Sequence, residues 1–343
     1  MQLFLKWMLE LAALTKLLAQ PRKIVITTHH KPDGDAMGSS LGLYNYLIQQ
    51  GHHVKVITPT DYPDFLAWLP GNGEVMIYTQ HIEEAAAAVA AAEIVFCLDF
   101  NALSRINELG ELVRESAALK IMIDHHLDPE DFDDYRHWNI NACATAQLIY
   151  DFIVNQLGNK SMINKDVATC LYTGIMTDSA SFRLPNTTAE VHRIAAELIE
   201  AGAVNWHIHE LVYSNSSESR LRFLGHCLSK KLVVLHEFNT ALISVSKQEL
   251  EEYDVVTGDT EGIVNYALSI TGIHLAAFIV ERTDKVKLSL RSRGEFPANE
   301  ICKKYFSGGG HRNAAGGVST DSLEEVIKQF KLILPEYKKL LIQ

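Results

Sequence analysis

Residues 23–35 read K-I-V-I-T-T-H-H-K-P-D-G-D, an apolar run that ends in two histidines and two aspartates. The run Ile24–Thr27 predicts a short buried strand. The spacing from about Asp35 to Gln50 predicts a helix, which Gly51 ends. A strand that leads through polar side chains into a helix is typical of a β-α-β unit. This stretch therefore indicates both the fold class and a candidate functional site.

The same alternation continues along the first half of the chain. Apolar runs predict further strands at Val54–Thr58, Ile94–Leu98 and Leu119–Ile123, and helical patterns fall at 81–92 and 103–116. Strands that alternate with helices predict an α/β fold, with a doubly wound, mainly parallel sheet covered by helices on both faces. Helices are expected to dominate from about Thr145 to Gly202.

The composition of the chain changes near residues 205–230, where a serine-rich polar stretch is followed by a charged helical pattern. We expect a first domain over 1–214, a linker helix over 215–228 and a smaller α+β domain over 229–343. The second domain is predicted to hold strands at 231–235, 240–245, 275–280 and 286–291, and a final amphipathic helix from Ser322 to about Tyr337.

Composition narrows the class of protein. The chain has 343 residues, is 47% hydrophobic and carries a formal charge of −11, which argues against disorder and against a globally basic nucleic-acid clamp. Residues 285–312 nevertheless form a local basic patch, for which a solvated face is the alternative reading. The five cysteines form no C-x-x-C pair and indicate a reducing compartment.

No targeting or membrane segment is expected. Lys6, Glu10 and Lys16 interrupt the apolar start of the chain, which reads as an amphipathic helix ended by Pro21. No run of 18 uncharged apolar residues follows, so we predict no membrane span and a cytoplasmic protein.

Three apolar strands end in carboxylate or imidazole side chains. The first leads into His29, His30, Asp33 and Asp35, the second into Asp99, and the third into Asp124, His125 and His126. The carboxyl ends of parallel strands meet along one crevice, which predicts a single cluster from distant segments. Each segment alone has a plain alternative, because Asp33-Gly34-Asp35 could be a turn and Asp99 a helix N-cap.

Such a cluster predicts divalent metal. Four or more carboxylates raise one another's pKa unless positive charge lies nearby. Oxygen and imidazole ligands without thiolate suit Mn²⁺ first, with Mg²⁺, Fe²⁺ or Co²⁺ as alternatives. The number of candidate ligands favours two ions, an arrangement that activates water and clamps a phosphoryl group.

These motifs resemble those of the DHH phosphoesterase superfamily. The first three motifs are residues 29–39, Leu98-Asp99-Phe100 with Arg105, and Asp124-His125-His126, and the fourth is Gly174–Ser179 with Ser181-Phe182-Arg183. The run Gly308–Gly316 resembles the signature of the DHH-associated C-terminal domain. The layout is most similar to the group of DHH enzymes that cleave very short RNA and dephosphorylate 3′-phosphoadenosine 5′-phosphate (pAp).

The resemblance implies roles for individual residues. One ion would be held by His29, Asp33 and Asp99, and the other by Asp35, Asp99, His125 and Asp178, with Asp99 bridging. Asp124 would orient His125, and His126 would contact the substrate phosphate. The active site would lie in the cleft between the domains. Substrate would be bound by groups of the second domain, namely Arg291, Arg293, Gly308, Gly309, Gly310, His311 and Arg312.

The implied activity is hydrolysis of di- to tetranucleotides to mononucleotides, and of pAp to AMP, by water that two metal ions activate. The substrate partners would be short RNA or nucleoside bisphosphates, and a homodimer is left open. The alternatives are an exopolyphosphatase or pyrophosphatase, a linear or cyclic dinucleotide phosphodiesterase of the same superfamily, and a nucleotide-binding protein without turnover.

Overall fold

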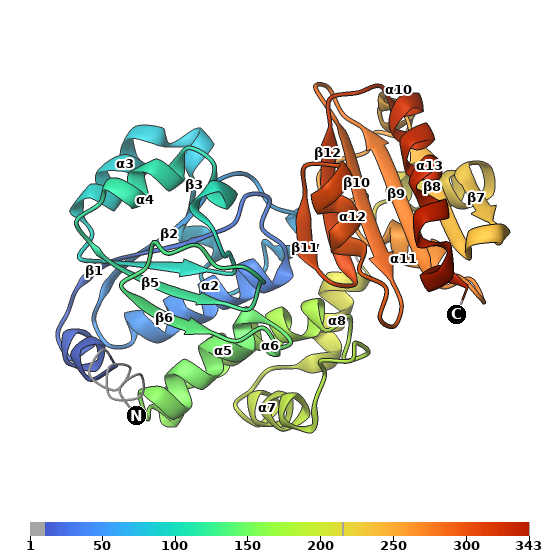
Figure 1. Cartoon of the computed structure of the whole chain (residues 1–343). Coiled ribbons are helices and arrows are strands. Elements are labelled where there is room, and N and C mark those ends of the chain that lie inside the picture. The colour runs from blue at the N-terminus through green and yellow to red at the C-terminus, as the bar shows by residue number, and fades with distance from the viewer. Residues whose placement is uncertain (1–10, 215, 343) are drawn as a thin grey trace. The chain divides into compact units, whose positions relative to one another are not determined.

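The computed structural model describes residues 11–214 and 216–342. They form two compact units, the first running up to residue 214 and the second beginning at Ser216 (Figure 1). Residues 11–18 are helical, while the rest of the amphipathic helix expected at the start lies outside the described residues. Among the described residues, no helix is long and apolar enough to cross a membrane.

The first unit is built on a six-stranded sheet in which all the strands run parallel. The strand order is β3-β2-β1-β4-β5-β6, which confirms the doubly wound sheet that the alternation predicts. The strands are β1 (Lys23–Thr28), β2 (His53–Thr58), β3 (Val75–Ile77), β4 (Ile94–Leu98), β5 (Leu119–Asp124) and β6 (Tyr135–Trp138).

Helices cover both faces of this sheet (Figure 1). One face carries α3 (Ile82–Ala91) and α4 (Leu109–Glu115), and the other carries α2 (Gly34–Ile48), α5 (Thr145–Asp151) and α6 (Lys165–Asp178). The first unit ends with α7 (Ala189–Glu200) and α8 (Asn205–Tyr213). Continuous apolar runs in β1 and β4 are buried, as strands covered on both faces require.

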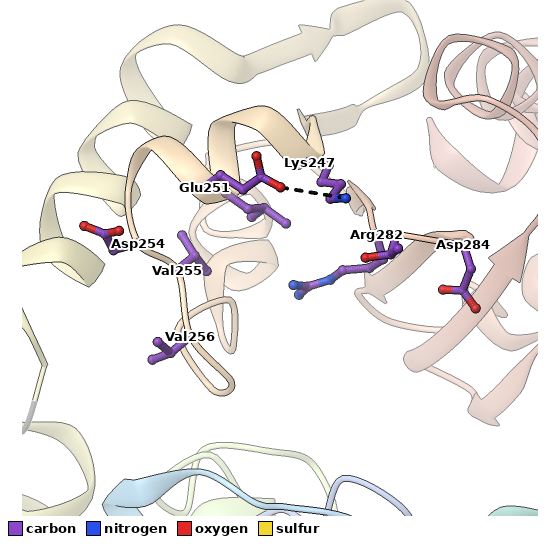
Figure 2. A pocket seen from close by; sticks show the side chains of 9 residues that line it. Lys247, Glu251, Asp254, Val255, Val256, Arg282 and Asp284 are labelled. Carbon is purple, nitrogen blue, oxygen red and sulfur yellow. Dashed lines mark ion pairs between the residues drawn. The ribbon is translucent and has the colours of Figure 1, made fainter.

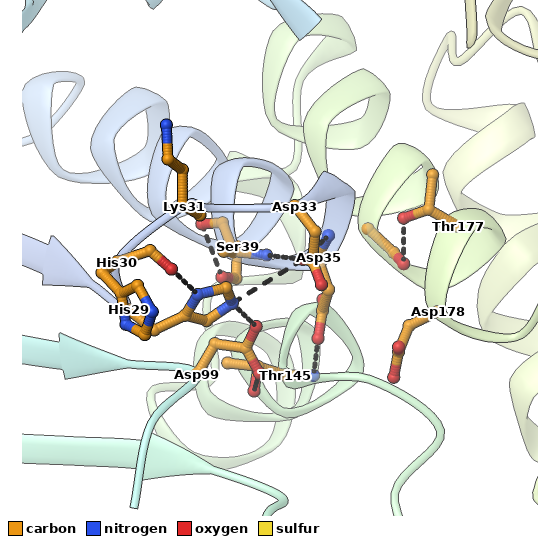
Figure 3. A network of polar contacts seen from close by, with 12 residues as sticks. His29, His30, Lys31, Asp33, Asp35, Ser39, Asp99, Thr145, Thr177 and Asp178 are labelled. Atoms are coloured by element: carbon orange, nitrogen blue, oxygen red, sulfur yellow. Dashed lines mark hydrogen bonds and ion pairs between the residues drawn. The ribbon is translucent and has the colours of Figure 1, made fainter. Parts of the chain in front are cut away.

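Three glycines let α2 and α6 approach closely. Gly34, Gly38 and Gly42 recur every fourth residue, so they share one face of α2. A Cβ at Gly38 would lie 2.6 Å from the carbonyl oxygen of Cys170 and 2.7 Å from the nitrogen of Gly174. The close approach places Asp35, near the start of α2, beside the end of α6 (Figure 3).

The second unit holds a mixed six-stranded sheet in the order β11-β12-β10-β9-β8-β7. Only β8 and β9 pair in parallel. The strands are β7 (Leu232–Leu235), β8 (Thr240–Val245), β9 (Leu275–Glu281), β10 (Val286–Ser292), β11 (Gly309–His311) and β12 (Ala314–Ser319). The helices are α9 (Glu218–His226), α10 (Lys247–Glu252), α11 (Ile263–Leu268), α12 (Ala298–Tyr305) and α13 (Leu323–Leu341).

Candidate metal centre

The histidine and aspartate segments meet where the order of the parallel strands reverses. β1 and β4 are neighbours in the sheet, but the chain after β1 leads to α2 on one face and the chain after β4 leads to α4 on the other. His29 follows β1 and Asp99 follows β4, and His29 Nε2 lies 3.5 Å from Asp99 Oδ2 (Figure 3). This switch point is where doubly wound sheets bind ligands.

One group of candidate ligands consists of His29, Asp33 and Asp99. Each offers one atom, and the three atoms lie within 4.8 Å of one another. Asp33 is also the N-cap of α2, where its Oδ1 accepts from the backbone nitrogens of Asp35 at 3.0 Å and Ala36 at 3.1 Å. Asp33 therefore caps the start of α2 and is also one of the candidate ligands of this group.

A second group consists of Asp35, Asp99 and His125, again with one atom from each within 4.8 Å. Asp178, the last residue of α6, brings its Oδ2 to 3.5 Å from His125 Nε2. Asp99 belongs to both groups. The four segments that carry the motifs thus converge, and one carboxylate, that of Asp99, lies in both groups.

The start of α5 fixes the orientation of two of these carboxylates. Asp35 accepts from the backbone nitrogens of Thr145 at 2.6 Å and Ala146 at 2.9 Å. Thr145 Oγ1 donates to Asp99 Oδ1 at 2.9 Å. Thr145 was not among the site residues predicted from the sequence. The one signal for it in the sequence is its position at the expected start of a helix. A threonine there offers both a free backbone N–H and a hydroxyl.

The structure corrects the expected partner of Asp124. Its Oδ1 lies 2.8 Å from Nδ1 of His126, whereas Nδ1 of His125 lies 3.1 Å from the carbonyl oxygen of Ala142. The two imidazole rings meet edge to face, with centroids 5.0 Å apart, so they present their nitrogens to different neighbours. Asp124 therefore orients His126, and a backbone carbonyl orients His125.

The carboxylates of the cluster act strongly on one another. Burial raises the pKa of Asp35 well above its ordinary value, and the charges of Asp99, Asp178 and Asp33 raise it further. Burial would also raise the pKa of Asp99, but the hydrogen bond with His29 and the charges of the three surrounding histidines hold it well below its ordinary range. Ionisation of the buried Asp35 carboxyl beside these carboxylates is therefore costly.

This arrangement fits bound cations. A buried carboxylate whose neighbours are carboxylates is costly to ionise unless positive charge compensates it. The donors are carboxylate oxygens and imidazole nitrogens, with no thiolate among them. One oxygen of Asp124 is also buried without a hydrogen-bond partner within the described chain. The residues present therefore form a site that one or more divalent cations can occupy.

The second unit brings part of the basic set together along its sheet. Arg291 on β10 pairs with Ala314 on β12, and Ala314 pairs with His311 on β11, so Arg291 and His311 lie in one row across three strands. Arg293 donates to the carbonyl oxygen of Leu268 at 2.8 Å. Arg312 forms an ion pair with Glu295 at 2.5 Å, so its charge is partly compensated.

The three consecutive glycines, Gly308, Gly309 and Gly310, differ in the structural reason for having no side chain. A Cβ at Gly308 would lie 2.0 Å from the carbonyl oxygen of Gly316, and one at Gly310 would lie 2.6 Å from that of Ala314. Gly310 also has a φ of +129°. Gly309, in contrast, has no atom within 4 Å of an added Cβ in the described chain. Packing of β11 on β12 explains Gly308 and Gly310, and Gly309 alone is open to a ligand.

A separate hollow of about 640 Å³ lies beside α10 in the second unit (Figure 2). The guanidinium group of Arg282 extends into it, and Lys247 pairs with Glu251 across 3.8 Å at its edge (Figure 2). Its lining residues are Lys247, Leu250, Glu251, Asp254, Val255, Val256, Arg282, Thr283 and Asp284. Acidic residues outnumber basic ones there, so this hollow does not favour a polyanionic substrate.

Comparison with known proteins agrees with this geometry. The family model described as the DHH family, N-terminal domain, matches residues 23–175, and the DHHA1 domain model matches residues 239–336. The "Bifunctional oligoribonuclease and PAP phosphatase NrnA" of Thermus thermophilus is 34% identical over 293 residues, which are 85% of this chain and 83% of the relative. The protein of that name from Bacillus subtilis is 24% identical over 92% of this chain and 96% of its own.

A solved structure described as an exopolyphosphatase-related protein from Bacteroides fragilis is 42% identical, with a TM-score of 0.93 over 98% of both chains. The matched domains and the shared fold place the protein among the two-domain phosphoesterases, a class of hydrolases. Within that class the chain belongs to the DHH family. The resemblance drawn from its motifs is confirmed.

Proposed function

We propose that the protein hydrolyses short oligoribonucleotides, from di- to tetranucleotides, to mononucleotides, and converts pAp to AMP and phosphate. Two relatives named for these activities match across at least 83% of their own length, which supports the proposal. The observation that carries it is the position of Asp99 in both groups of candidate ligands, because a shared carboxylate is what a two-ion phosphoesterase site needs.

We assign His29, Asp33 and Asp99 to one ion, and Asp35, Asp99, His125 and Asp178 to the other. The mixture of oxygen and imidazole donors favours Mn²⁺, with Mg²⁺, Fe²⁺ and Co²⁺ as the alternatives. When bound, the ions would supply an activated water and offset the charge of the phosphoryl group. The start of α5 holds Asp35 and Asp99 in place for this task through Thr145.

His126 is proposed to contact the substrate phosphate. Asp124 is fully buried and accepts from Nδ1 of His126, so the ring is held with a proton on that nitrogen. Nε2 is the other ring nitrogen, and we assign the phosphate contact to it. Asp124 would thus act through His126, as a positioning residue.

The second unit is proposed to bind the part of the substrate remote from the cleaved bond. Arg291 and His311 lie in one row, and Gly309 leaves the backbone of β11 accessible within that unit. Guanidinium and backbone N–H groups recognise phosphate. Arg293, Gly308, Gly310 and Arg312 belong to the same proposed region, although Gly308 and Gly310 also have a packing role. The domain boundaries, the cytoplasmic location and a homodimer stay predictions.

A panel of substrates tests the proposal. A dinucleotide, a long RNA strand, pAp, a cyclic dinucleotide, pyrophosphate and polyphosphate are each assayed with Mn²⁺. We expect the dinucleotide and pAp to be hydrolysed fastest. Preference for polyphosphate or pyrophosphate would favour an exopolyphosphatase or pyrophosphatase, which the name of the Bacteroides fragilis relative makes the leading alternative. Hydrolysis of none, with tight nucleotide binding, would indicate a non-catalytic binder.

A further inference from the structure

A large aromatic side chain lies exposed next to the candidate metal centre. Trp138 is the last residue of β6, and the residue is 38% exposed. In the pairing of β5 with β6, Trp138 lies directly opposite Asp124. It is therefore at the carboxyl edge of the sheet, beside the strand end that carries Asp124, His125 and His126.

The indole is also held in place. Its Nε1 donates to the carbonyl oxygen of His126 at 2.7 Å, and the next backbone nitrogen, that of Asn139, donates to the carbonyl oxygen of Asp124 at 3.3 Å. A partly exposed ring that is fixed at its polar end offers an apolar surface without a large loss of side-chain entropy on binding. Trp138 is thereby tied to the residue proposed to contact phosphate.

We propose that Trp138 is a stacking platform for the nucleobase attached to the phosphate being cleaved. The inference rests on the proposed function and deepens it, because it names a part of the substrate that a bare phosphate chain lacks. A nucleobase stacks on an indole whatever its sequence, which suits an enzyme for mixed short RNA. Trp138 would make this site select nucleotides over polyphosphate and pyrophosphate.

The rival explanation is that Trp138 only braces the segment after β5 through its Nε1. Two substitutions separate the explanations. Trp138→Phe keeps an aromatic face but removes the Nε1 hydrogen bond, whereas Trp138→Leu removes both. Stacking predicts that the Phe variant stays within a few fold of wild type and that the Leu variant raises KM for a dinucleotide by roughly tenfold or more.

Binding provides the readout that does not depend on turnover. AMP and ribose 5-phosphate are titrated into the full-length chain with Mn²⁺, by calorimetry and by tryptophan fluorescence. Trp206, which is 67% exposed on α8, supplies the control, because Trp206→Phe should leave quenching by AMP unchanged. We expect Trp138→Leu to weaken AMP binding by roughly tenfold and to leave ribose 5-phosphate binding unaltered.

Equal AMP affinity in wild type and Trp138→Leu would overturn the inference, as would equal losses in the Phe and Leu variants on every ligand. The proposed function fails separately. If wild type hydrolyses no dinucleotide but AMP binding still depends on Trp138, the stacking role of Trp138 is supported and the assigned reaction is contradicted. If dinucleotides are hydrolysed but AMP binding does not depend on Trp138, the assigned reaction is supported and the stacking role of Trp138 is contradicted.

Discussion

Asp99 follows β4 with a φ of +63°, in the left-handed region that few residues other than glycine, asparagine and aspartate adopt. In this position it contacts His29, His125 and Thr145 at once. A backbone conformation that costs free energy, at the residue common to both candidate ligand groups, indicates that the site rather than the strand dictates the local geometry.

Asp99→Asn tests the role of that charge. Asparagine has the same shape and tolerates the left-handed region, so the fold should be retained. We expect turnover of a dinucleotide with Mn²⁺ to fall by about a thousandfold or more, because the ligand proposed to serve both ions loses its charge. Steady-state kinetics and circular dichroism measure the two effects. Activity within a few fold of wild type would rule out the shared-ligand role.

Ala180, Ser181 and Phe182 form a second strained segment, shortly after α6 ends at Asp178. All three have positive φ values, of 49°, 60° and 63°. Ala180→Gly should therefore stabilise the protein by about 0.5–1 kcal/mol, since glycine adopts this region without the Cβ penalty. Thermal unfolding measures the shift. Ala87→Gly, in the exposed face of α3, is the control and should destabilise by about 1 kcal/mol.

At the scale of elements, the crossing of α2 and α6 determines whether the site can assemble. Gly174 on α6 leaves room for Asp35, because a Cβ at Gly174 would lie 2.9 Å from Asp35 Oδ1. Gly38 allows the backbones of the two helices to touch. The small residues that appear in the sequence as part of a motif are thus explained by helix packing as much as by chemistry.

Gly38→Ala should separate the two helices. We expect a loss of about 1–3 kcal/mol in the free energy of unfolding, because the added methyl group meets backbone atoms that cannot move aside. Weaker Mn²⁺ binding should accompany it. Gly73→Ala is the matched control, since a Cβ there has no neighbour within 4 Å. Equal stability of the two variants would contradict the packing argument.

Glu249 anchors α10 in the second unit. It closes a capping box with Ser246 and contacts His226 Nε2 at 2.8 Å and Lys231 Nζ at 3.0 Å. Burial alone would raise its pKa, but the Ser246 backbone, Lys231 and His226 lower it from 4.5 to about 2. Its contribution to stability is therefore fully present above pH 4.5 and is lost as the pH falls towards 2.

Glu249→Ala should destabilise the protein by about 1–3 kcal/mol at neutral pH. The difference from wild type should shrink below about pH 4.5, where the unfolded chain takes up the proton first. Denaturant unfolding at several pH values measures this. Glu251→Ala removes an exposed partner at 3.8 Å and should change stability by less than about 0.5 kcal/mol. A pH-independent difference for Glu249→Ala would refute the linkage.

Several elements could be predicted because their apolar runs are continuous. The strands at Ile94–Leu98 and Thr240–Val245 match the expected bounds, and those at the start of the chain differ by one residue. The short strands β3 and β6 were missed because they have three or four residues and no long apolar run. β11 and β12 were missed because glycine and alanine carry little strand signal.

Other differences also have physical reasons. The helix expected over 103–116 is divided into a short 3-10 turn, Leu103–Ile106, and α4, because Asn107 has a φ of +53°. α13 continues to Leu341 through Pro335 rather than ending near Tyr337. At the site, ligand types at strand ends could be read directly from the sequence. The contacts of the Thr145 backbone nitrogen and the Ala142 carbonyl could not, since every residue type but proline carries the same backbone donor and acceptor.

At the scale of the whole molecule, the protein has two units with separate cores, and we propose a different function for each: metal binding and substrate binding. The first unit carries the side chains that we assign to the metal ions, and the second carries the basic row on β10 and β11. Cations that bind only the folded first unit must stabilise it by mass action. The metal site is therefore part of the stability of that unit as well as of its chemistry.

Removal of metal should show this coupling. Chelation is expected to abolish hydrolysis and to lower the unfolding temperature, and Mn²⁺ should restore both better than Zn²⁺. Free Mn²⁺ at a hundred times its Kd should add about 2.7 kcal/mol. Scanning calorimetry with and without Mn²⁺ measures the shift, and Asp99→Asn should abolish most of it. A shift that is the same in Asp99→Asn would place the bound metal elsewhere.

The most direct test is an anomalous difference map, at the manganese edge, from crystals of the full-length protein grown or soaked with Mn²⁺. We expect two peaks. One should contact His29, Asp33 and Asp99, and the other Asp35, Asp99, His125 and Asp178. Peaks only at other positions, or none at the switch point of the first sheet, would contradict the assignment of these side chains as the metal centre of a phosphoesterase.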